Sequence, residues 1–541
     1  MSPRNDLTRP PDLTHERRTG PLRTQRPHYV DLLPPCNEAC PAGEDIQGWL
    51  ARVVSGQLEE AWRHLARDNP MPAVVGRVCY HPCETGCNRA QLDTAVSIHA
   101  VERFLGDRAR ELGWKVEPDA PPSGKRVLVV GAGPSGLSAA YHLARRGHAV
   151  EVHEAGPVAG GMMVFGIPAY RLPREVLADE VRRIEEMGVK LVFDHKVEDL
   201  LAEKRDGAFD AVFLAIGAHI GKRTEIPARD AGKILEALSF LRGAGDGVAP
   251  TLGRRVAIYG GGNTAMDAAR TAKRLGYEPL IIYRRDREHM PATPEEADEA
   301  AAEGVKFHWL RSIKTIDATS FTVEVMDLDA AGKPRPTGHL ETIEADALVL
   351  ALGQDVDSGF LEQVTGLARR ADGAIEVSPE LMTGHDGVFA GGDMIPSERT
   401  VTVAIGHGKK AARSIDAYLR GARVEVPPKH AIAAFGMLHL PFGTDAPQRA
   451  QPRLDSAARA SSFVEVVSGL DDRAVAFEAQ RCLSCGNCYE CDGCYGACPE
   501  DAVVKLGPGK RYRYDYDRCT GCAVCFEQCP CHAIEMIEEH A

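Results

Sequence analysis

The chain has 541 residues, of which 44% are hydrophobic and 26% charged, as is typical of soluble globular proteins with several domains. A net charge of −13 argues against a general nucleic-acid binder, because such proteins carry a basic surface. No apolar run reaches the about 18 residues of a membrane span, and the N-terminus lacks a signal-peptide core. The sixteen cysteines lie in CxxC-like arrays, which indicates metal ligation in a reducing cytoplasm rather than disulfides.

The first two segments differ in composition. Residues 1–33 are rich in Arg and Pro and are predicted to be a disordered tail, with a partner-docking arm as the alternative. Residues 34–120 show helical spacing of apolar positions and are predicted to be a small helical domain. This domain carries five cysteines, and four thiolates would suit one cubane [4Fe–4S] cluster or a structural zinc ion. The five are Cys36, Cys40, Cys79, Cys83 and Cys87.

A dinucleotide-binding fingerprint opens the central region. An apolar strand at 125–131 leads into Gly131-Ala-Gly-Pro-Ser-Gly136, a helix follows, and a second strand ends at Glu154. Gly131 permits the tight turn, Gly133 lets the backbone approach a pyrophosphate, and Gly136 allows close helix–strand packing. The helix N-terminus, with Ser135, faces the phosphates, and Glu154 lies where a carboxylate accepts ribose hydroxyls.

A second copy of the fingerprint follows a strand that begins at residue 254. Its turn and first helical residues are Gly260, Gly262, Asn263, Thr264 and Ala265. After the next strand come Arg284 and Arg285 where an acidic residue would select NADH. Two guanidinium groups suit a 2′-phosphate, so the sequence predicts NADPH. The alternative is that these arginines only decorate a solvated edge.

Further motifs carry a family resemblance. Apolar strands end at Gly217, at residue 353 and at Gly392-Asp393, and the segment 160–173 reads GGMMVFGIPAYRLP. With the HMPA segment at 289–292, this pattern resembles the two-dinucleotide-domain flavoproteins. Within them it is similar to the glutamate synthase small-subunit family and to the N-terminal part of dihydropyrimidine dehydrogenase.

The resemblance implies an α/β flavoprotein fold. An FAD domain, 121–250 and 356–443, would carry an inserted NADPH domain at 251–355. In the family a Gly-Asp pair like Gly392-Asp393 grips the ribityl chain, and Thr402 would begin a helix that faces the isoalloxazine. Gly161 and Gly217 complete the expected cofactor contacts. No cysteine lies in this region, so electrons cannot leave the flavin through a dithiol.

For the front cysteines the resemblance implies one cluster. Its ligands would be Cys40, Cys79, Cys83 and Cys87, with Cys36 left over. Relatives with two N-terminal clusters carry further cysteines upstream that this chain lacks, so a second front cluster is not expected.

The C-terminal cysteines form an internal duplication. Cys-x2-Cys-x2-Cys-x3-Cys-Pro occurs twice with an offset of 31 residues, the pattern of two-cluster bacterial ferredoxins, in which the fourth cysteine ligates the other cluster. We predict a linker at 444–475 and an α+β ferredoxin-like domain at 476–541 with two [4Fe–4S] clusters. The first ligand set is Cys488, Cys491, Cys494 and Cys529, and the second is Cys519, Cys522, Cys525 and Cys498. Cys482, Cys485 and Cys531 remain unassigned, and the first two leave the register of the first cluster open.

These parts predict an NADPH-dependent FAD/iron–sulfur oxidoreductase with three clusters. It would pass electrons between NADP(H) and a ferredoxin or a large enzyme subunit in a hetero-oligomer, such as a 2-oxoacid:ferredoxin oxidoreductase, with no side-chain acid, base or nucleophile needed. One alternative is a glutamate synthase small subunit that serves a large amidotransferase subunit. A non-enzymatic cluster scaffold is the other, and the intact fingerprint glycines speak against it.

Overall fold

Two parallel sheets, each of five strands, form the middle of the chain. In the computed structural model, residues 23–222, 226–227, 233–426, 428–440 and 445–539 are described. The first sheet has the order β16-β5-β2-β3-β4. Its central strands β2 and β5 are buried apart from Arg126 at the start of β2, which explains their nearly continuous apolar sequence. The strands are β2 (Arg126–Val130), β3 (Ala149–His153), β4 (Lys190–Val192), β5 (Ala211–Leu214) and β16 (Val388–Ala390).

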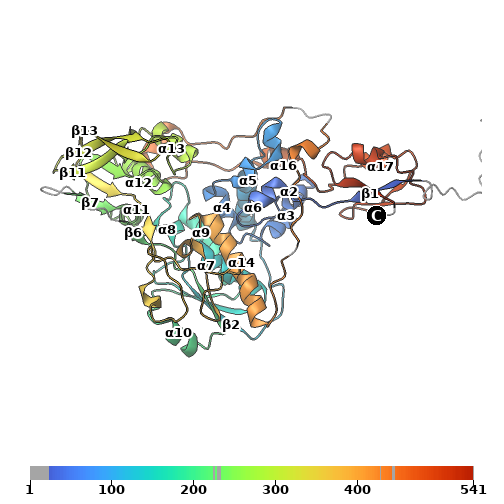
Figure 1. The fold of residues 1–541 in the computed structure, drawn as a ribbon, viewed down its shortest axis with the longest axis horizontal. Coiled ribbons are helices and arrows are strands. Elements are labelled where there is room, and N and C mark those ends of the chain that lie inside the picture. The colour runs from blue at the N-terminus through green and yellow to red at the C-terminus, as the bar shows by residue number, and fades with distance from the viewer. Residues whose placement is uncertain (1–22, 223–225, 228–232, 427, 441–444, 540–541) are drawn as a thin grey trace, which may run out of the picture.

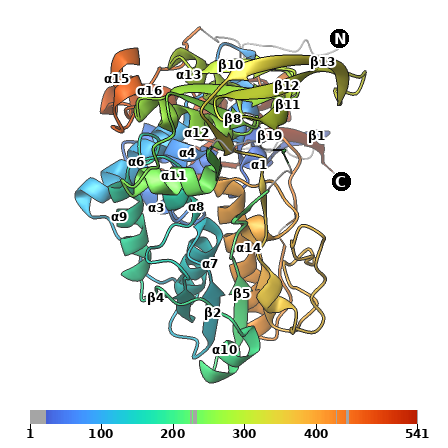
Figure 2. The same cartoon turned by 90° about the vertical axis from the view of Figure 1, so that its left-hand side faces the viewer.

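Helices α7 and α14 pack along each other in this first domain (Figures 1 and 2). The side chain of Thr400 caps α14 by accepting a hydrogen bond from the backbone N–H of Val403, at 3.1 Å. Three other helices complete the domain. The helices are α7 (Pro134–Arg145), α8 (Met162–Phe165), α9 (Arg174–Glu185), α10 (Leu200–Asp206) and α14 (Val401–Leu419).

The second sheet has the order β10-β9-β8-β14-β7 and belongs to a domain inserted between β5 and β16 of the first. Its strands are β7 (Lys233–Glu236), β8 (Arg255–Tyr259), β9 (Glu278–Tyr283), β10 (Lys306–Trp309) and β14 (Ala347–Leu350). Its helices are α11 (Ala237–Gly245), α12 (Asn263–Arg274) and α13 (Pro294–Ala302). An antiparallel sheet packs on one face through Phe321 and Val323, and it consists of β11 (Arg311–Ile316), β12 (Ser320–Leu328) and β13 (Pro334–Glu344).

The chain crosses between the two domains as a pair of short antiparallel strands, β6 (Ile220–Gly221) and β15 (Gln354–Asp355). The second domain therefore begins well before residue 251, where the sequence analysis placed it. Strand β7 and helix α11 already belong to it. The reason is that β7 is a four-residue edge strand, too short to show an alternating pattern.

The helical domain lies between the second nucleotide domain and the ferredoxin-like unit along the long axis, and its helix α4 contacts α9 and α14 of the first domain (Figure 1). Trp49 and Trp62 fill its core and are fully buried. Its helices are α1 (Pro35–Ala39), α2 (Ile46–Val54), α3 (Leu58–Leu65), α4 (Pro72–Val78), α5 (Pro82–Thr85), α6 (Ile98–Leu112) and α16 (Asp472–Gln480). Helix α16 packs on α2 and α6 and adds Val475 and Ala479 to the same core. Because that core buries its apolar face, the segment around 472–485 joins the helical domain and not the ferredoxin-like one.

The ferredoxin-like unit lies at one end of the long axis (Figure 1). Its strand β19 pairs with β1, which lies near the start of the chain. The prediction of a disordered tail over residues 1–33 is therefore wrong for residues 25–29. Residues 1–22 lie outside the described residues. The tail segment is held because Tyr29 stacks on Tyr514 and Arg23 pairs with Glu539 at 2.6 Å. The elements are β1 (Gln25–Tyr29), α17 (Gly493–Ala497), β17 (Val503–Lys505), β18 (Tyr512–Tyr514), α18 (Val524–Glu527) and β19 (Ile534–Glu538).

The predicted linker is packed along the body of the protein. Residues 445–471 run from the helical domain to the second nucleotide domain, where α15 (Ser456–Ser461) contacts α12, and return to α16. The backbone N–H of Val466 donates to the carbonyl of Tyr170, and Arg453 pairs with Glu299 at 3.1 Å. The segment therefore contacts the helical domain and both nucleotide domains and connects them.

Candidate functional site

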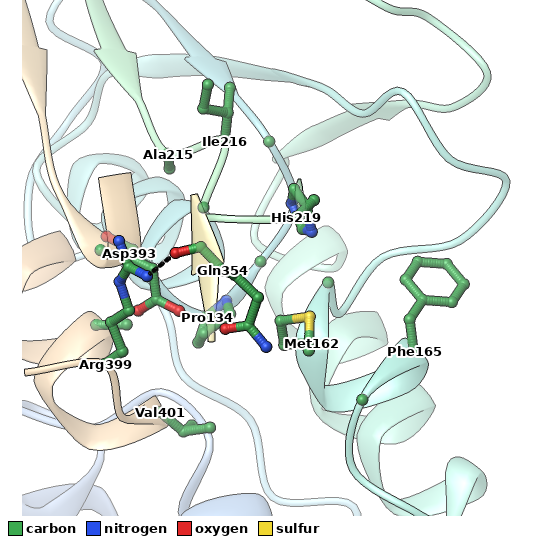
Figure 3. A pocket seen from close by; sticks show the side chains of 18 of the residues that line it. Pro134, Met162, Phe165, Ala215, Ile216, His219, Gln354, Asp393, Arg399 and Val401 are labelled. Carbon is green, nitrogen blue, oxygen red and sulfur yellow. Dashed lines mark hydrogen bonds between the residues drawn. The ribbon is translucent and has the colours of Figure 1, made fainter. Parts of the chain in front are cut away.

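A cavity of about 670 Å³ lies between the two nucleotide domains and is lined by both. The first domain contributes the β2–α7 turn, Glu154 and Asp393, and the second contributes Asn263 and Thr264 at the start of α12. Figure 3 shows Pro134 of α7, Met162 and Phe165 of α8, and Asp393 and Arg399 around this space. A cavity of this size between domains, lined by apolar and polar side chains together, is a usual form of a cofactor site.

The β2–α7 turn has the shape that a dinucleotide pyrophosphate needs. Gly131 adopts φ +103°, and a Cβ there would lie 2.5 Å from the carbonyl oxygen of Ala215. At Gly136 a Cβ would lie 1.9 Å from the carbonyl oxygen of Gly131, so helix and strand pack closely only because this residue is glycine. Gly133, in contrast, faces open space. The buried hydroxyl of Ser135 has no partner within the described residues, and together these features fit a phosphate at the N-terminus of α7.

Glu154 is fixed at the carboxyl end of β3. Its two carboxylate oxygens accept hydrogen bonds from the backbone N–H groups of Ala132 and Gly156, both at 2.7 Å. The side chain lines the cavity, so its remaining lone pairs suit the ribose hydroxyls of an adenine dinucleotide.

Asp393, Gly392, Gly161 and Gly217 also line the cavity, as expected of ribityl and phosphate contacts. Burial raises the pKa of Asp393, and Arg399 opposes that rise. Thr402 does not line the cavity; its helix contributes Val401 and Ala404 instead. Thr402 is buried beside Cys79, between the cavity and the front cysteines.

The second fingerprint faces the same cavity with its first helical turn. Gly260 and Gly262 form the turn before α12, Ala265 is buried against the sheet, and Gly262 leaves open space for a ligand. Arg284 and Arg285 directly follow β9, the second strand of this fingerprint, and they do not line the cavity. The Nε of Arg285 donates to the hydroxyl of Tyr283 at 2.9 Å. Among the described residues, no carboxylate is within salt-bridge distance of either guanidinium.

A buried ion cluster at this interface could not be foreseen from sequence. Arg171 of the first domain pairs with Asp267 of α12 at 2.8 Å and with Glu296 of α13 at 2.5 Å. Arg171 and Asp267 line the cavity, and burial raises the pKa of Asp267 to about 6 against the opposing effect of Arg171. The cluster joins elements distant in sequence, and no local motif marks it.

The front cysteines fall into two groups. Cys40, Cys79 and Cys83 interact with one another and with the buried carboxylate of Glu102. Cys79 stands between Val78 and Tyr80, which both line the large cavity, so this group lies directly beside the cofactor site. Cys87, expected in the same set, lies elsewhere: it shares a small cavity with Cys36, Cys482 and Cys485. The expected ligand set is therefore wrong at Cys87, because the chain turns after α5 and directs that thiol toward α1 and α16.

The C-terminal cysteines are grouped in the crossed manner of the duplicated motif. Cys498 lines one cavity with Cys519, Cys522 and Cys525. Cys529 interacts with Cys488 and Cys494, which both interact with Cys491. The sulfur of Cys531 lies 3.8 Å from that of Cys529. Backbone N–H groups of Ala502, Gly521 and Ala533 point at the sulfurs of Cys498, Cys519 and Cys529, which stabilises thiolates.

The spacing of the thiols suits clusters better than zinc. All sixteen cysteines are free, and no three described thiol sulfurs lie within 4.8 Å of one another. Four thiolates around zinc, each about 2.3 Å from the metal, would be only about 3.8 Å apart. An iron–sulfur cubane holds its four cysteines farther apart because the ligands bind separate iron atoms.

Together the fold and cavity define a flavin- and NADPH-dependent oxidoreductase that also carries [4Fe–4S] clusters. Family comparison agrees: the chain belongs to the pyridine nucleotide-disulphide oxidoreductases, whose model matches residues 125–408. The model for dihydropyrimidine dehydrogenase domain II, 4Fe-4S cluster, matches residues 32–114, and a 4Fe-4S binding domain matches 512–535. The expected resemblance, fold class and cofactors FAD, NADPH and [4Fe–4S] are thereby confirmed.

Three curated relatives illustrate the range of the family. The NADP(+)-dependent formate dehydrogenase subunit beta of Moorella thermoacetica is 35% identical, covering 83% of this chain and 70% of the relative. The NADPH-Fe(3+) oxidoreductase subunit beta of Geobacter sulfurreducens is 34% identical, covering 83% and 75%. The glutamate synthase [NADPH] small chain of Azospirillum brasilense is 33% identical, covering 73% and 88%. In the described part of the chain, no helix has the length and apolarity to span a membrane.

Proposed function

We propose that this chain is the NADP(H)-handling subunit of a multi-subunit oxidoreductase. One observation carries the proposal: the cavity lined by both fingerprints is bordered by Val78 and Tyr80, the two neighbours of Cys79. A flavin bound in the cavity would therefore lie next to a nicotinamide held by the second domain and next to a cluster bound by Cys79. Bound FAD supplies two-electron hydride chemistry, and bound [4Fe–4S] clusters supply single-electron transfer.

The residues of this chain hold and orient these groups. The β2–α7 turn and Ser135 would hold the FAD pyrophosphate, Glu154 its ribose, and Asp393 its ribityl chain. Arg284 and Arg285 would select the 2′-phosphate of NADPH. Arg171, through Asp267 and Glu296, fixes the angle between the two domains and thus the approach of nicotinamide to flavin.

The ferredoxin-like unit is the proposed contact with the partner. It stands at one end of the molecule, away from both nucleotide sheets (Figure 1). Cys491 and Cys522, one from each ligand set, are exposed, so both clusters would lie close to the surface. A partner that docks there could exchange electrons without entering the flavin cavity. The curated relatives described above as beta or small subunits support a larger partner.

The proposal is tested with anaerobically purified and reconstituted chain. We expect one FAD per chain, fast flavin bleaching by NADPH in stopped flow, and NADPH-driven reduction of benzyl viologen. In Cys522→Ser the bleaching should persist while reduction of an added ferredoxin falls at least tenfold. Absence of FAD, or bleaching by NADH but not NADPH, contradicts the proposal. Activity only with a glutamate synthase large chain would favour the glutamate synthase alternative instead.

A further inference from the structure

Four thiols from opposite ends of the chain line one small cavity in the helical domain. Cys36 lies at the start of α1, Cys87 follows α5, and Cys482 and Cys485 follow α16. Each of them interacts electrostatically with at least one of the others. Sequence spacing gave no reason to group them, because about 400 residues separate the two pairs. The packing of α16 on α2 and α6 brings them together.

The loop from Cys482 to Cys485 has the backbone shape of the two ferredoxin loops. In Cys488–Cys491 and Cys519–Cys522, the residue two after the first cysteine and the one directly after the second are left-handed, with φ between 60° and 72°. In the new loop the corresponding residues are Ser484, with φ 52°, and Gly486, with φ 75°. A left-handed serine costs about 1–2 kcal/mol and persists only where the surroundings require it.

The left-handed turn directs a backbone donor at the thiol. The N–H of Ser484 points at the sulfur of Cys482 at 3.4 Å, as that of Gly521 does at Cys519, also at 3.4 Å. The Asn88 side chain donates to the sulfur of Cys485 at 3.4 Å. Such donors stabilise thiolates, and a buried thiol without a metal would gain little from them.

The cavity resembles one at the ferredoxin site. Both measure about 20 Å³, and the other is lined by Cys498, Cys519, Cys522 and Cys525. Leu50, Val96 and Ile98 form an apolar part of the remaining lining of the cavity in the helical domain, which would limit the access of water to a cluster, while Gln47, Asn88 and Arg89 add polar groups. The four thiols are not paired in disulfides and are too widely spaced for zinc.

We propose that Cys36, Cys87, Cys482 and Cys485 ligate a fourth [4Fe–4S] cluster. The site lies between the front group and the ferredoxin-like unit. Cys83 and Cys87 are four residues apart, and Cys485 and Cys488 three, so their Cα atoms lie within about 14 Å and about 11 Å. The cluster would bridge the gap between the cofactor cavity and the exposed end. The assignment is independent of the nicotinamide preference and of the partner's identity.

The test counts metal in reconstituted full-length protein. We expect about sixteen iron and sixteen sulfide per chain in the wild type, at four of each per cluster. The double variant Cys482→Ser/Cys485→Ser should lose about four of each and keep its FAD and its flavin bleaching by NADPH. Leu483→Ala, in the same loop but with both thiols intact, should lose none.

Cys36→Ser repeats the test from the other end of the chain and covers the case in which the double variant fails to fold. It should lose the same four iron atoms. Wild-type iron content in either cysteine variant overturns the proposal, because the four iron atoms would then not depend on these thiols. One zinc per chain that disappears in the cysteine variants overturns it as well.

Discussion

Gly133 and Gly136 have different tasks within one turn, and two alanine substitutions should separate them. A Cβ at Gly133 meets nothing within 4 Å, so Gly133→Ala should leave stability within about 0.5 kcal/mol while it fills the space for the pyrophosphate. Gly136→Ala places its Cβ 1.9 Å from a carbonyl oxygen and should cost about 3 kcal/mol. Urea unfolding and FAD titration measure both effects. Equal loss of stability in the two variants would contradict this division.

Arg284 and Arg285 are the residues that we propose select NADPH over NADH. A charge-assisted hydrogen bond contributes about 1.5–3 kcal/mol, so Arg284→Ala/Arg285→Ala should raise KM for NADPH at least tenfold and leave KM for NADH nearly unchanged. The matched control is Arg287→Ala, because Arg287 is already engaged with Asp298. Steady-state kinetics with both cofactors provide the measurement. An equal rise of KM for NADPH and NADH would show that the arginines do not bind the 2′-phosphate.

At the level of elements, the Arg171 cluster holds α12 and α13 against the first domain. Arg171→Met leaves Asp267 and Glu296 buried without their partner and should destabilise the protein by about 3–5 kcal/mol. It should also slow flavin bleaching by NADPH, because the angle between the domains is no longer fixed. The control is Arg183→Met. Arg183 forms a buried ion pair with Glu180 within α9, with 2.5 Å between nitrogen and oxygen, and this pair lies away from the interface.

Stopped-flow bleaching and urea unfolding distinguish the two roles of the cluster. Both variants should lose stability, but only Arg171→Met should lose hydride-transfer rate. If both variants slow bleaching equally, the cluster is a general stabilising contact and does not orient the domains.

The sequence predicted the elements whose patterns are local. The two glycine turns, Glu154, Asp393 and the duplicated ferredoxin cysteines lie within short segments, and the structure places them at or around the predicted sites. The regrouping of Cys87 with Cys482 and Cys485 could not be predicted, because it depends on α16 packing into a core formed by residues about 400 positions earlier. Strand β1 was missed since its five residues, QRPHY, read as a polar, proline-containing tail.

At the scale of the whole molecule, the two ends of the chain are exchanged between the outer domains. Strand β1, near the start of the chain, pairs with β19 of the ferredoxin-like unit, and helix α16, from the last fifth of the chain, completes the helical core. The segment 445–471 adds contacts with the second nucleotide domain through α15 and α12. Contacts between residues so distant in sequence make folding slow, but they leave few independent parts that could open separately.

This exchange of chain ends has a consequence for folding during synthesis. Domains generally fold as units while the ribosome still extends the chain. Both nucleotide domains can fold in that way, but β1 has no strand partner until β19, the last strand of the described residues, has been made. The thiol site of Cys36 and Cys87 is likewise incomplete until Cys482 and Cys485 have been synthesised. A nascent chain would thus already contain both folded nucleotide domains while the site of Cys36 and Cys87 still lacks half of its thiols.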